Sequence, residues 1–134
     1  MTAFTSNDSV SRKPRTKGEL EAAISRAFIR LEKEFTGRGP VETHTYLLND
    51  LVVVRLCGVM TPAEQNLLRA NERGAYLIKQ SRLELTQVKR PRIEEIVREF
   101  LNVGIRSLHT DICTETGERI VALSLDGRPT IPEE

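Results

Sequence analysis

The segment FTGRGPVETHTYLLNDLVVVRLCGVMTPAE, residues 35–64, decides the fold of this chain. Gly37 suits the left-handed position that closes a helix, and Pro40 prevents that helix from continuing. Two apolar runs follow, and only Asn49 and Asp50 stand between them. Both residues tolerate positive φ, which favours a tight two-residue turn. The segment therefore predicts a helix end, a hairpin and the start of a new helix.

The short turn also sets the register of the two predicted strands, residues 41–48 and 51–59, with Leu48 opposite Leu51. One face of this hairpin is expected to point to the core, and it consists of Val41, Thr43, Thr45, Leu47, Val52, Val54 and Leu56. The other face carries the apolar side chains Tyr46, Leu48, Leu51 and Val53. A solvated face needs fewer apolar groups than this, so these four residues are predicted to form an interface.

The chain before this segment predicts an amphipathic helix. Thr16-Lys-Gly-Glu19 matches a capping box, which marks a helix start. Apolar residues then recur at steps of three and four as far as Phe35, and the charged residues between them, Glu32 included, are expected on the solvated side. Residues 1–15 are polar and aperiodic, so they are predicted to be a disordered tail.

A second capping box, Thr61-Pro-Ala-Glu64, opens the helical region after the first hairpin. Its apolar pattern predicts a long or kinked helix with one weak point at Gly74. That helix is expected to end near Pro91, because proline lacks the backbone N–H that continues a helix. A further short helix is predicted from Ile93 to about Asn102.

Residues 103–113 and 119–126 predict a second hairpin, turned at Thr114-Glu-Thr-Gly117. Its register stays open by one residue, since the loop can contain three or four residues. The order α-ββ-αα-ββ predicts an α+β fold, a four-stranded antiparallel sheet with helices packed mainly on one face. A single domain is expected over residues 16–128, followed by a C-terminal tail at residues 129–134.

Composition limits the classes of function. A chain of 134 residues can bury one core without metals or disulfides. Its formal net charge of +1 predicts no strong overall attraction to nucleic acid or anionic lipid. Cys57 and Cys113 fall in different predicted strands and are interpreted as reduced thiols. No stretch approaches the length of a membrane span, so a soluble cytoplasmic protein is expected.

Two arginines and one histidine are the binding candidates of the deciding segment. Glycine and proline explain the turn around Arg38, which leaves its guanidinium for a carboxylate or phosphate. Arg55 lies opposite His44 in the predicted register. We therefore predict that Arg38, Arg55 and His44 contact a small anion or a protein partner. No catalytic residue, metal ligand or cofactor is assigned.

Two alternative functions rest on other residues. His109 and Asp111 share one face of a strand and, with Ser107, resemble part of an acid–base or metal site, although no nucleophile elbow accompanies them. The basic cluster Lys89-Arg-Pro-Arg92 suits nucleic acid, but glutamates interleave with it and no aromatic platform is present. A non-enzymatic protein is favoured over a small enzyme, a metal-binding protein or a nucleic-acid-binding module.

Several motifs in matching order resemble the MpsC-like family of small bacterial proteins. They are Phe35-Thr-Gly-Arg-Gly-Pro40, Asn49-Asp-Leu-Val-Val-Val-Arg-Leu-Cys-Gly58, Met60-Thr-Pro-Ala-Glu64, His109-Thr-Asp-Ile112 and Thr116-Gly-Glu118. The likeness covers residues 17–126. It implies an association with a cation-translocating, membrane-potential-generating system whose membrane components look like inorganic-carbon transporters, and it brings no catalytic residues.

These features together predict a cytoplasmic accessory or regulatory protein that binds a partner or a small anion. A homodimer is expected from the apolar sheet face. The resemblance adds a membrane transport complex as a partner, which would hold the protein at the inner membrane.

Overall fold

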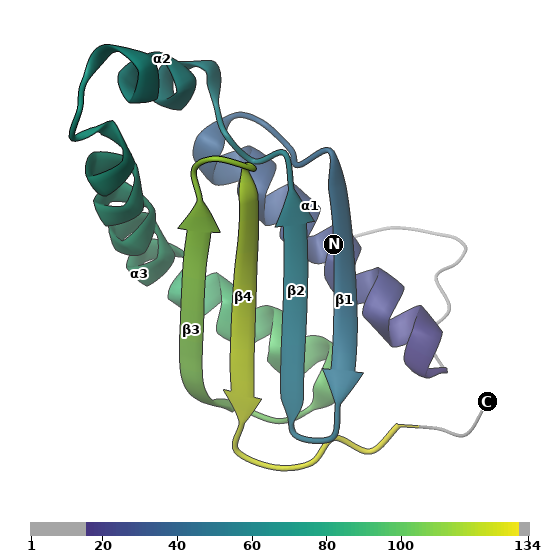
Figure 1. Ribbon diagram of the computed structural model, residues 1–134. Helices are drawn as coiled ribbons and strands as arrows, with labels where there is room; N and C mark the ends of the chain where they lie inside the picture. Colours follow the sequence, from purple (N-terminus) through teal and green to yellow (C-terminus); the bar gives the residue numbers. More distant parts are fainter. Residues whose placement is uncertain (1–15, 132–134) are drawn as a thin grey trace.

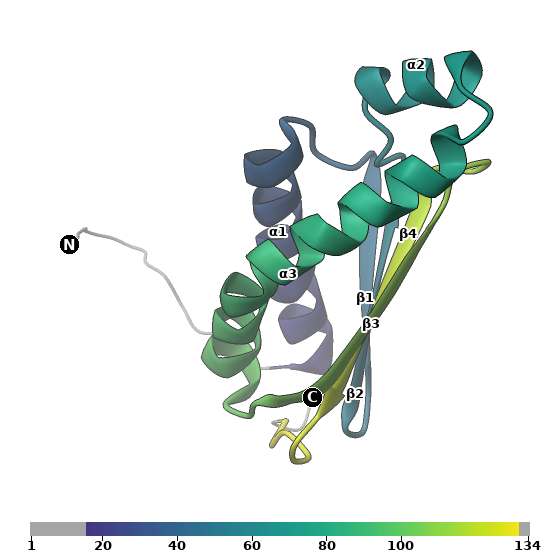
Figure 2. The same ribbon diagram turned by 90° about the vertical axis from the view of Figure 1, so that its left-hand side faces the viewer.

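The computed structural model describes residues 16–131, which form one sheet with helices on one side of it (Figures 1 and 2). The elements in chain order are α1 (Lys17–Thr36), β1 (Glu42–Leu48), β2 (Leu51–Cys57), α2 (Pro62–Ala70), α3 (Gly74–Leu101), β3 (Ile105–Cys113) and β4 (Glu118–Leu125). Figure 2 shows α1 and α3 on the same side of the sheet and α2 beyond its end. The predicted α+β class and element order are confirmed. The tail predicted at residues 1–15 lies outside the described residues.

Both hairpins join one antiparallel sheet of order β1-β2-β4-β3. Leu48 pairs with Leu51, as the two-residue turn predicted. In the second hairpin Cys113 pairs with Glu118 around residues 114–117, which fixes the register that the sequence left open. Gly117 takes the left-handed conformation there, with a φ of 75°. The two hairpins meet through β2 and β4 at the centre of the sheet.

Two capping boxes start α1 and α2 as predicted. The Thr16 hydroxyl accepts from the Glu19 N–H at 3.1 Å, and the Thr16 N–H donates to the Glu19 carboxylate at 2.9 Å. Thr61 and Glu64 make the same exchange at 3.1 and 2.9 Å. These bonds satisfy amides that a helix start leaves without intrahelical partners.

The helical region after β2 breaks at a different place from the predicted one. The prediction of a helix end near Pro91 is wrong, because α3 runs through this proline to Leu101. Pro91 is exposed, so water can satisfy the carbonyl that its missing N–H leaves unpaired. The chain breaks instead before Gly74, where a Cβ atom would lie 2.7 Å from the Leu67 carbonyl oxygen. None of the helices in residues 16–131 is long and apolar enough to cross a membrane.

The core fills the space between the sheet and α1 and α3. Its buried apolar residues include Ile24, Phe28, Leu31, Val52, Val54, Leu56, Ile78, Ile93, Val97, Val121, Leu123 and Leu125. Val41, predicted to point to the core, is exposed and precedes β1. Glu32, expected on the solvated side of its helix, is buried. Pro129 is buried and Ile131 packs on the core, although the sequence pattern assigned both to a tail.

Candidate functional site: an open sheet face and a buried charge cluster

The sheet has one face that α1 and α3 leave bare (Figure 2). The strand register places rows of residues on this face, across β1, β2, β4 and β3. We call it the open face. Its first row is Leu48, Leu51, Ser124 and Ser107, its second is Tyr46, Val53, Ala122 and His109, and its third is His44, Arg55, Ile120 and Asp111. A fourth row contains the pairs Glu42 with Cys57 and Glu118 with Cys113.

The four residues predicted as an interface lie together on this open face. Tyr46 and Leu48 on β1 expose 45% and 52% of their surface, and Leu51 and Val53 on β2 are half-buried. Strand alternation explains the arrangement, because the residues between them point to the core. The structure thus places a contiguous apolar patch on a face that the described helices leave bare.

His44 and Arg55 face each other as predicted, and each already has a carboxylate partner on the open face. His44 Nε2 lies 3.2 Å from the Glu42 carboxylate, and Arg55 Nε donates to Glu118 at 2.6 Å. The hydrogen bond to Glu118, followed by the charge of that carboxylate, raises the pKa of Arg55. Exposed pairs of this kind contribute little to stability, so a binding partner can replace them at low cost.

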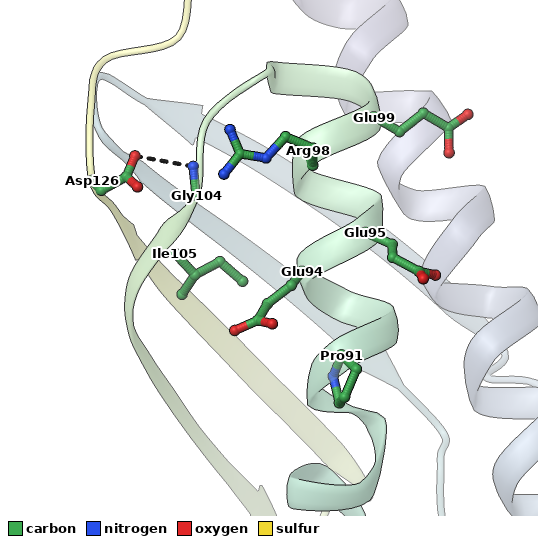
Figure 3. Close-up of a pocket in the computed structure, with 8 residues that line it drawn as sticks. All are labelled: Pro91, Glu94, Glu95, Arg98, Glu99, Gly104, Ile105 and Asp126. Atoms are coloured by element: carbon green, nitrogen blue, oxygen red, sulfur yellow. Dashed lines mark hydrogen bonds between the residues drawn. The ribbon is translucent and has the colours of Figure 1, made fainter.

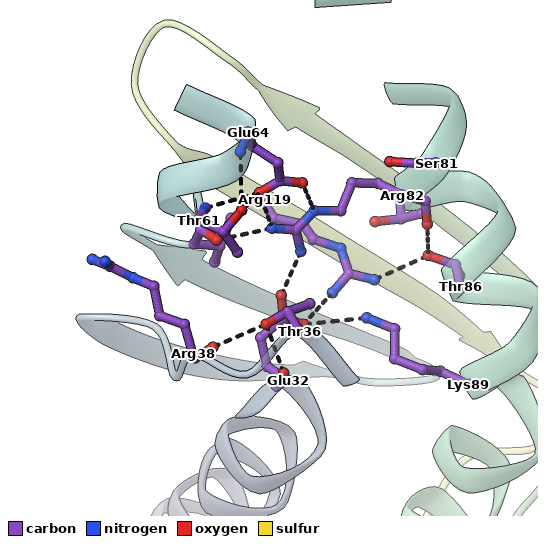
Figure 4. A network of polar contacts seen from close by, with 12 residues as sticks. Glu32, Thr36, Arg38, Thr61, Glu64, Ser81, Arg82, Thr86, Lys89 and Arg119 are labelled. Atoms are coloured by element: carbon purple, nitrogen blue, oxygen red, sulfur yellow. Dashed lines mark hydrogen bonds and ion pairs between the residues drawn. The ribbon is translucent and has the colours of Figure 1, made fainter. Parts of the chain in front are cut away.

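Arg38 lies apart from His44 and Arg55, in the loop after α1. It lines a hollow of about 270 Å³ whose other walls are Gly58, Met60, Gln65, Leu68, Thr114, Glu115, Thr116 and Gly117. Figure 4 shows the Arg38 side chain directed away from the polar network beside it. Neither Arg55 nor His44 lines this hollow. The three predicted binding residues therefore do not form one site.

A group of charged side chains buried between helices and sheet was missed by the sequence reasoning (Figure 4). We call it the buried charge cluster, and it consists of the buried residues Glu32, Arg82, Lys89 and Arg119 together with the half-buried Glu64 at its margin. Glu32 is at its centre. Its carboxylate accepts from Arg82 at 2.6 Å, from Arg119 at 3.0 Å and from Lys89 at 3.2 Å. Arg82 also donates to both Glu64 oxygens, at 2.7 and 2.8 Å.

Burial sets the protonation of this cluster. It lowers the pKa of Lys89 to about 8, and the charge of Arg119 adds to this effect while Glu32 opposes it. Burial also acts to raise the pKa of Glu32, but the charges of Lys89, Arg119 and Arg82 outweigh it and hold that pKa below its ordinary value. Three cations against two carboxylates leave one excess positive charge. Lys89 is therefore the member whose charge changes most easily.

The buried charge cluster connects elements and does not present chemistry to solvent. Glu32 belongs to α1, Glu64 to α2, Arg82 and Lys89 to α3, and Arg119 to β4. Each carboxylate oxygen accepts at least one hydrogen bond, and Lys89 has 0% of its surface exposed. Lys89 is therefore closed to solvent, whereas Glu64 keeps 16% of its side chain exposed at the margin of the cluster. The cluster fixes how the helices pack on the sheet.

The sequence did contain a signal for the buried charge cluster. Polar and charged residues of α3 are in phase with its apolar stripe, at the buried positions Ile78, Arg82, Thr86, Lys89, Ile93 and Val97. Arg119 starts the alternation of inward residues that continues with Val121, Leu123 and Leu125. The assumption that charged residues face solvent concealed both patterns.

The basic cluster at residues 89–92 does not form one surface. Lys89 is buried, Arg90 lies 3.2 Å from Glu94, and Arg92 lies 2.8 Å from Glu34. Neighbouring carboxylates therefore offset the charge that remains exposed here. Nucleic-acid binding stays an untested alternative, without a continuous basic stripe at these positions.

Ser107, His109 and Asp111 share one face of β3 without forming a relay. His109 Nε2 lies 3.1 Å from Ser107 Oγ, whereas Asp111 is engaged by Lys79 of α3 at 3.1 Å. Among residues 16–131, His, Cys, Asp and Glu side chains do not gather in any group of three or more that could hold a metal ion. The enzyme and metal-binding alternatives lack an assembled site in this part of the chain.

A shallow groove of about 790 Å³ runs beside the C-terminal half of α3 (Figure 3). It is lined by Pro91, Glu94, Glu95, Arg98, Glu99, Gly104, Ile105 and Asp126. The Asp126 carboxylate accepts from the Gly104 N–H at 3.0 Å, which joins the end of β4 to the start of β3. Carboxylates outnumber the single arginine, so this groove is unsuited to the small anion predicted above.

Comparisons with known proteins agree with the motifs quoted above. Residues 16–127 match the family described as "Na+-translocating membrane potential-generating system (MpsC)". A curated relative, "Uncharacterized protein YbcI" of Bacillus subtilis (strain 168), is 35% identical over 111 residues, which cover 83% of this chain and 89% of the relative. No solved structure matches significantly. Since the family match spans nearly all described residues, the chain belongs to the MpsC family.

Proposed function

We propose that this protein is a non-enzymatic accessory or regulatory protein that acts by binding a protein partner through its open face. The observation that carries the proposal is the apolar patch of Tyr46, Leu48, Leu51 and Val53, which no helix among residues 16–131 covers. Contiguous apolar patches on a soluble domain mark interaction sites, because their exposure to water is unfavourable. The charged groups around the patch suit orientation of a partner better than chemical reaction.

The family description suggests the context in which this binding takes place. It names a Na+-translocating system that generates a membrane potential. We propose that the protein works at the cytoplasmic side of the inner membrane, in contact with the membrane components of such a system. The family description alone supports this context, and the open face supports the mode of contact.

Affinity capture with matched variants tests the proposal. Tagged wild-type protein, a Tyr46→Thr/Leu48→Thr variant and a Tyr76→Thr/Leu83→Thr control are expressed in native cells, and the proteins retained after detergent extraction are identified by mass spectrometry. Tyr76 and Leu83 on α3 expose 54% and 47% of their surface, close to the values of the residues tested. Threonine suits a strand and has nearly the helix propensity of tyrosine, whereas its propensity is below that of leucine, so the control must also keep the wild-type circular dichroism spectrum.

Wild-type protein and the control are expected to retain membrane components of a cation or inorganic-carbon transport system. The open-face variant is expected to lose them while keeping its circular dichroism spectrum. Equal retention of membrane components by all three proteins would show that the open face does not bind them. If wild-type protein retains no membrane component, the proposed contact with a membrane transport system is wrong.

We also propose Arg38 as the contact for a small anion. Its guanidinium makes no ion pair within residues 16–131, and it lines the hollow together with the hydroxyl-bearing Thr114 and Thr116 and one carboxylate, that of Glu115. Titration with sodium bicarbonate or phosphate, followed by NMR, is expected to shift resonances around this hollow in wild-type protein and not in Arg38→Gln. Identical shifts in both proteins would exclude Arg38.

A further inference from the structure

We propose that the open face binds the open face of a second copy of this chain, with a two-fold axis parallel to the strands. The inference rests on the proposed function, because it concerns the same surface: the second copy occupies the open face reversibly, and a membrane component that binds there displaces it. Two identical faces that pack on each other are related by a two-fold axis lying in the plane of contact. Two directions of this axis align the strands of both copies, and the side chains of the open face discriminate between them.

An axis parallel to the strands passes between β2 and β4, the central pair of the sheet. It places β1 of one copy over β3 of the other and β2 over β4, and it keeps each row of the open face over the same row. An axis across the strands places each strand over its own copy instead. It then exchanges the first row with the fourth and the second with the third.

Side-chain size favours the axis parallel to the strands. The first hairpin presents its large groups, Tyr46, Leu48, Leu51 and Val53, whereas the second hairpin presents Ser107, His109, Ala122 and Ser124 in the same two rows. The parallel axis places Leu51 over Ser124 and Val53 over Ala122, so large groups meet small ones. The other axis places the large groups of β1 and β2 over the polar third and fourth rows of the same strands, so that Val53 lies over Arg55 and Leu48 over Glu42. Interfaces pack well when large and small side chains alternate across them.

Charge favours the same axis. In the third row His44 lies over Asp111 of the second copy, and Arg55 lies over Ile120, next to Glu118. Asp111 exposes 75% of its side chain, so its carboxylate can accept a hydrogen bond from the His44 ring besides the one from Lys79. Burial of a charge against an apolar group is unfavourable. The parallel axis makes one such contact in each half, Arg55 over Ile120, whereas the axis across the strands makes two, Leu48 over Glu42 and Val53 over Arg55.

The size of the open face fits a reversible dimer. Strands about 4.8 Å apart that rise about 3.3 Å per residue give a face of roughly 20 by 20 Å. Two such faces bury on the order of 1,000 Å² of accessible surface in total, which is the lower range of specific interfaces. Sheets that pack face to face keep their strands within about 30° of each other, which the parallel axis permits. The dimer is therefore expected to dissociate on dilution.

Cysteine cross-linking tests the arrangement with the full chain. In a Cys57→Ser background, Glu42→Cys introduces a thiol that the parallel axis places over native Cys113 of the second copy. Ser107→Cys introduces a thiol that only the axis across the strands places over Cys113. Within one chain, residues 42 and 113 lie on opposite edge strands, about 14 Å apart at the spacing of strands, beyond the span of a short bismaleimide. The background variant alone controls for cross-links between native thiols.

The expected result is a covalent dimer with Glu42→Cys and none with Ser107→Cys or with the background. Light scattering is expected to show a mass that rises from one chain to two with concentration, and the Tyr46→Thr/Leu48→Thr variant is expected to stay a monomer with an unchanged circular dichroism spectrum. Cross-linking of Ser107→Cys instead of Glu42→Cys would overturn the proposed axis.

A wild-type monomer at every concentration would overturn the dimer. In that case, loss of membrane components by the Tyr46→Thr/Leu48→Thr variant would still support the proposed function, because the open face would then bind a different protein.

Discussion

Lys89 is the residue at which burial and charge conflict most strongly. Its ammonium is removed from water and lies near two arginines, and its one carboxylate partner, Glu32, is shared with both of them. Removal of an ion from water costs several kcal/mol, and a shared carboxylate repays only part of that cost. The protein keeps its helices packed on the sheet although this lysine opposes folding.

Lys89→Met is expected to raise the free energy of unfolding at pH 7 by about 2 kcal/mol. The folded chain binds the Lys89 proton with a pKa of about 8, and the unfolded chain binds it with the ordinary value of 10.5. Between these values the unfolded state holds more protons, so wild-type stability rises with pH, and the full penalty acts below pH 8. Urea unfolding from pH 7 to 10 should show this rise in wild-type protein and a flatter profile in Lys89→Met.

Lys79→Met is the matched control, because Lys79 lies on the same helix with its side chain 43% exposed. It is expected to keep the wild-type dependence on pH. If Lys89→Met were less stable than wild type at pH 7, the ammonium would be required for packing.

Glu32→Gln is expected to destabilise the fold by about 3 kcal/mol, because it leaves three buried cations with only one carboxylate. Glu34→Gln, two positions away on α1, removes an exposed partner of Arg92 and should leave the urea midpoint unchanged. Equal midpoints for both variants would contradict the central role of Glu32.

Local chemistry made some residues predictable and others not. Thr16 and Glu19 cap a helix through partners three residues away, so their roles are visible in a short window. Glu32 depends on Arg82, Lys89 and Arg119, which are 50, 57 and 87 residues away. A window along the chain cannot show that a charge has buried partners at such separations.

Among the elements, the hairpins were predictable and the division between α2 and α3 was not. A two-residue turn permits one register, and strand alternation then assigns every side chain to a face. Pro91 was expected to end a helix, yet its exposed position lets α3 continue. Gly74 marks the actual break because α2 ends directly against its backbone, and that contact arises only in the folded chain.

Gly74→Ala is expected to destabilise the corner between α2 and α3 by roughly 2 kcal/mol, since the added methyl group meets backbone atoms of Leu67 and Leu68 at 2.7 and 2.8 Å. Hydrogen exchange should increase in α2, which buries none of its residues. Gly39→Ala is the control, because its nearest contact, the Ile29 side chain, would be at 3.8 Å. Unchanged exchange in α2 would show that the corner can widen freely.

For the whole molecule, the one-sided layering determines which surfaces are available. Strand alternation in the sequence predicted an apolar outer face on the first hairpin. The pairing of β2 with β4 extends that face across four strands, and this pairing joins segments that are distant in the sequence.

Cys113 lies at one corner of this face and is exposed. Hydrogen bonds from the Thr116 side chain and from the backbone of Thr116 and Glu115 lower its pKa, which favours the reactive thiolate.

Alkylation of Cys113 is therefore expected to become slower as protein concentration rises, because the second copy in the proposed dimer would cover the open face. Mass spectrometry after short iodoacetamide pulses measures the rate. The Tyr46→Thr/Leu48→Thr variant should react at one rate at all concentrations. A wild-type rate that is independent of concentration would place Cys113 outside any contact.

A hydrogen bond at an edge strand of the sheet limits how copies of this chain can assemble. The Glu21 carboxylate accepts from the Leu47 N–H at 2.9 Å, so this outward amide of edge strand β1 is already occupied. At the other margin, the irregular register between Ile105 and Ser107 disturbs the regular row of groups that a new strand would need. Extension of the sheet from copy to copy through its edge strands is therefore disfavoured. Even in a crowded cell, self-association of this protein should stop at a finite particle and should not proceed to fibres.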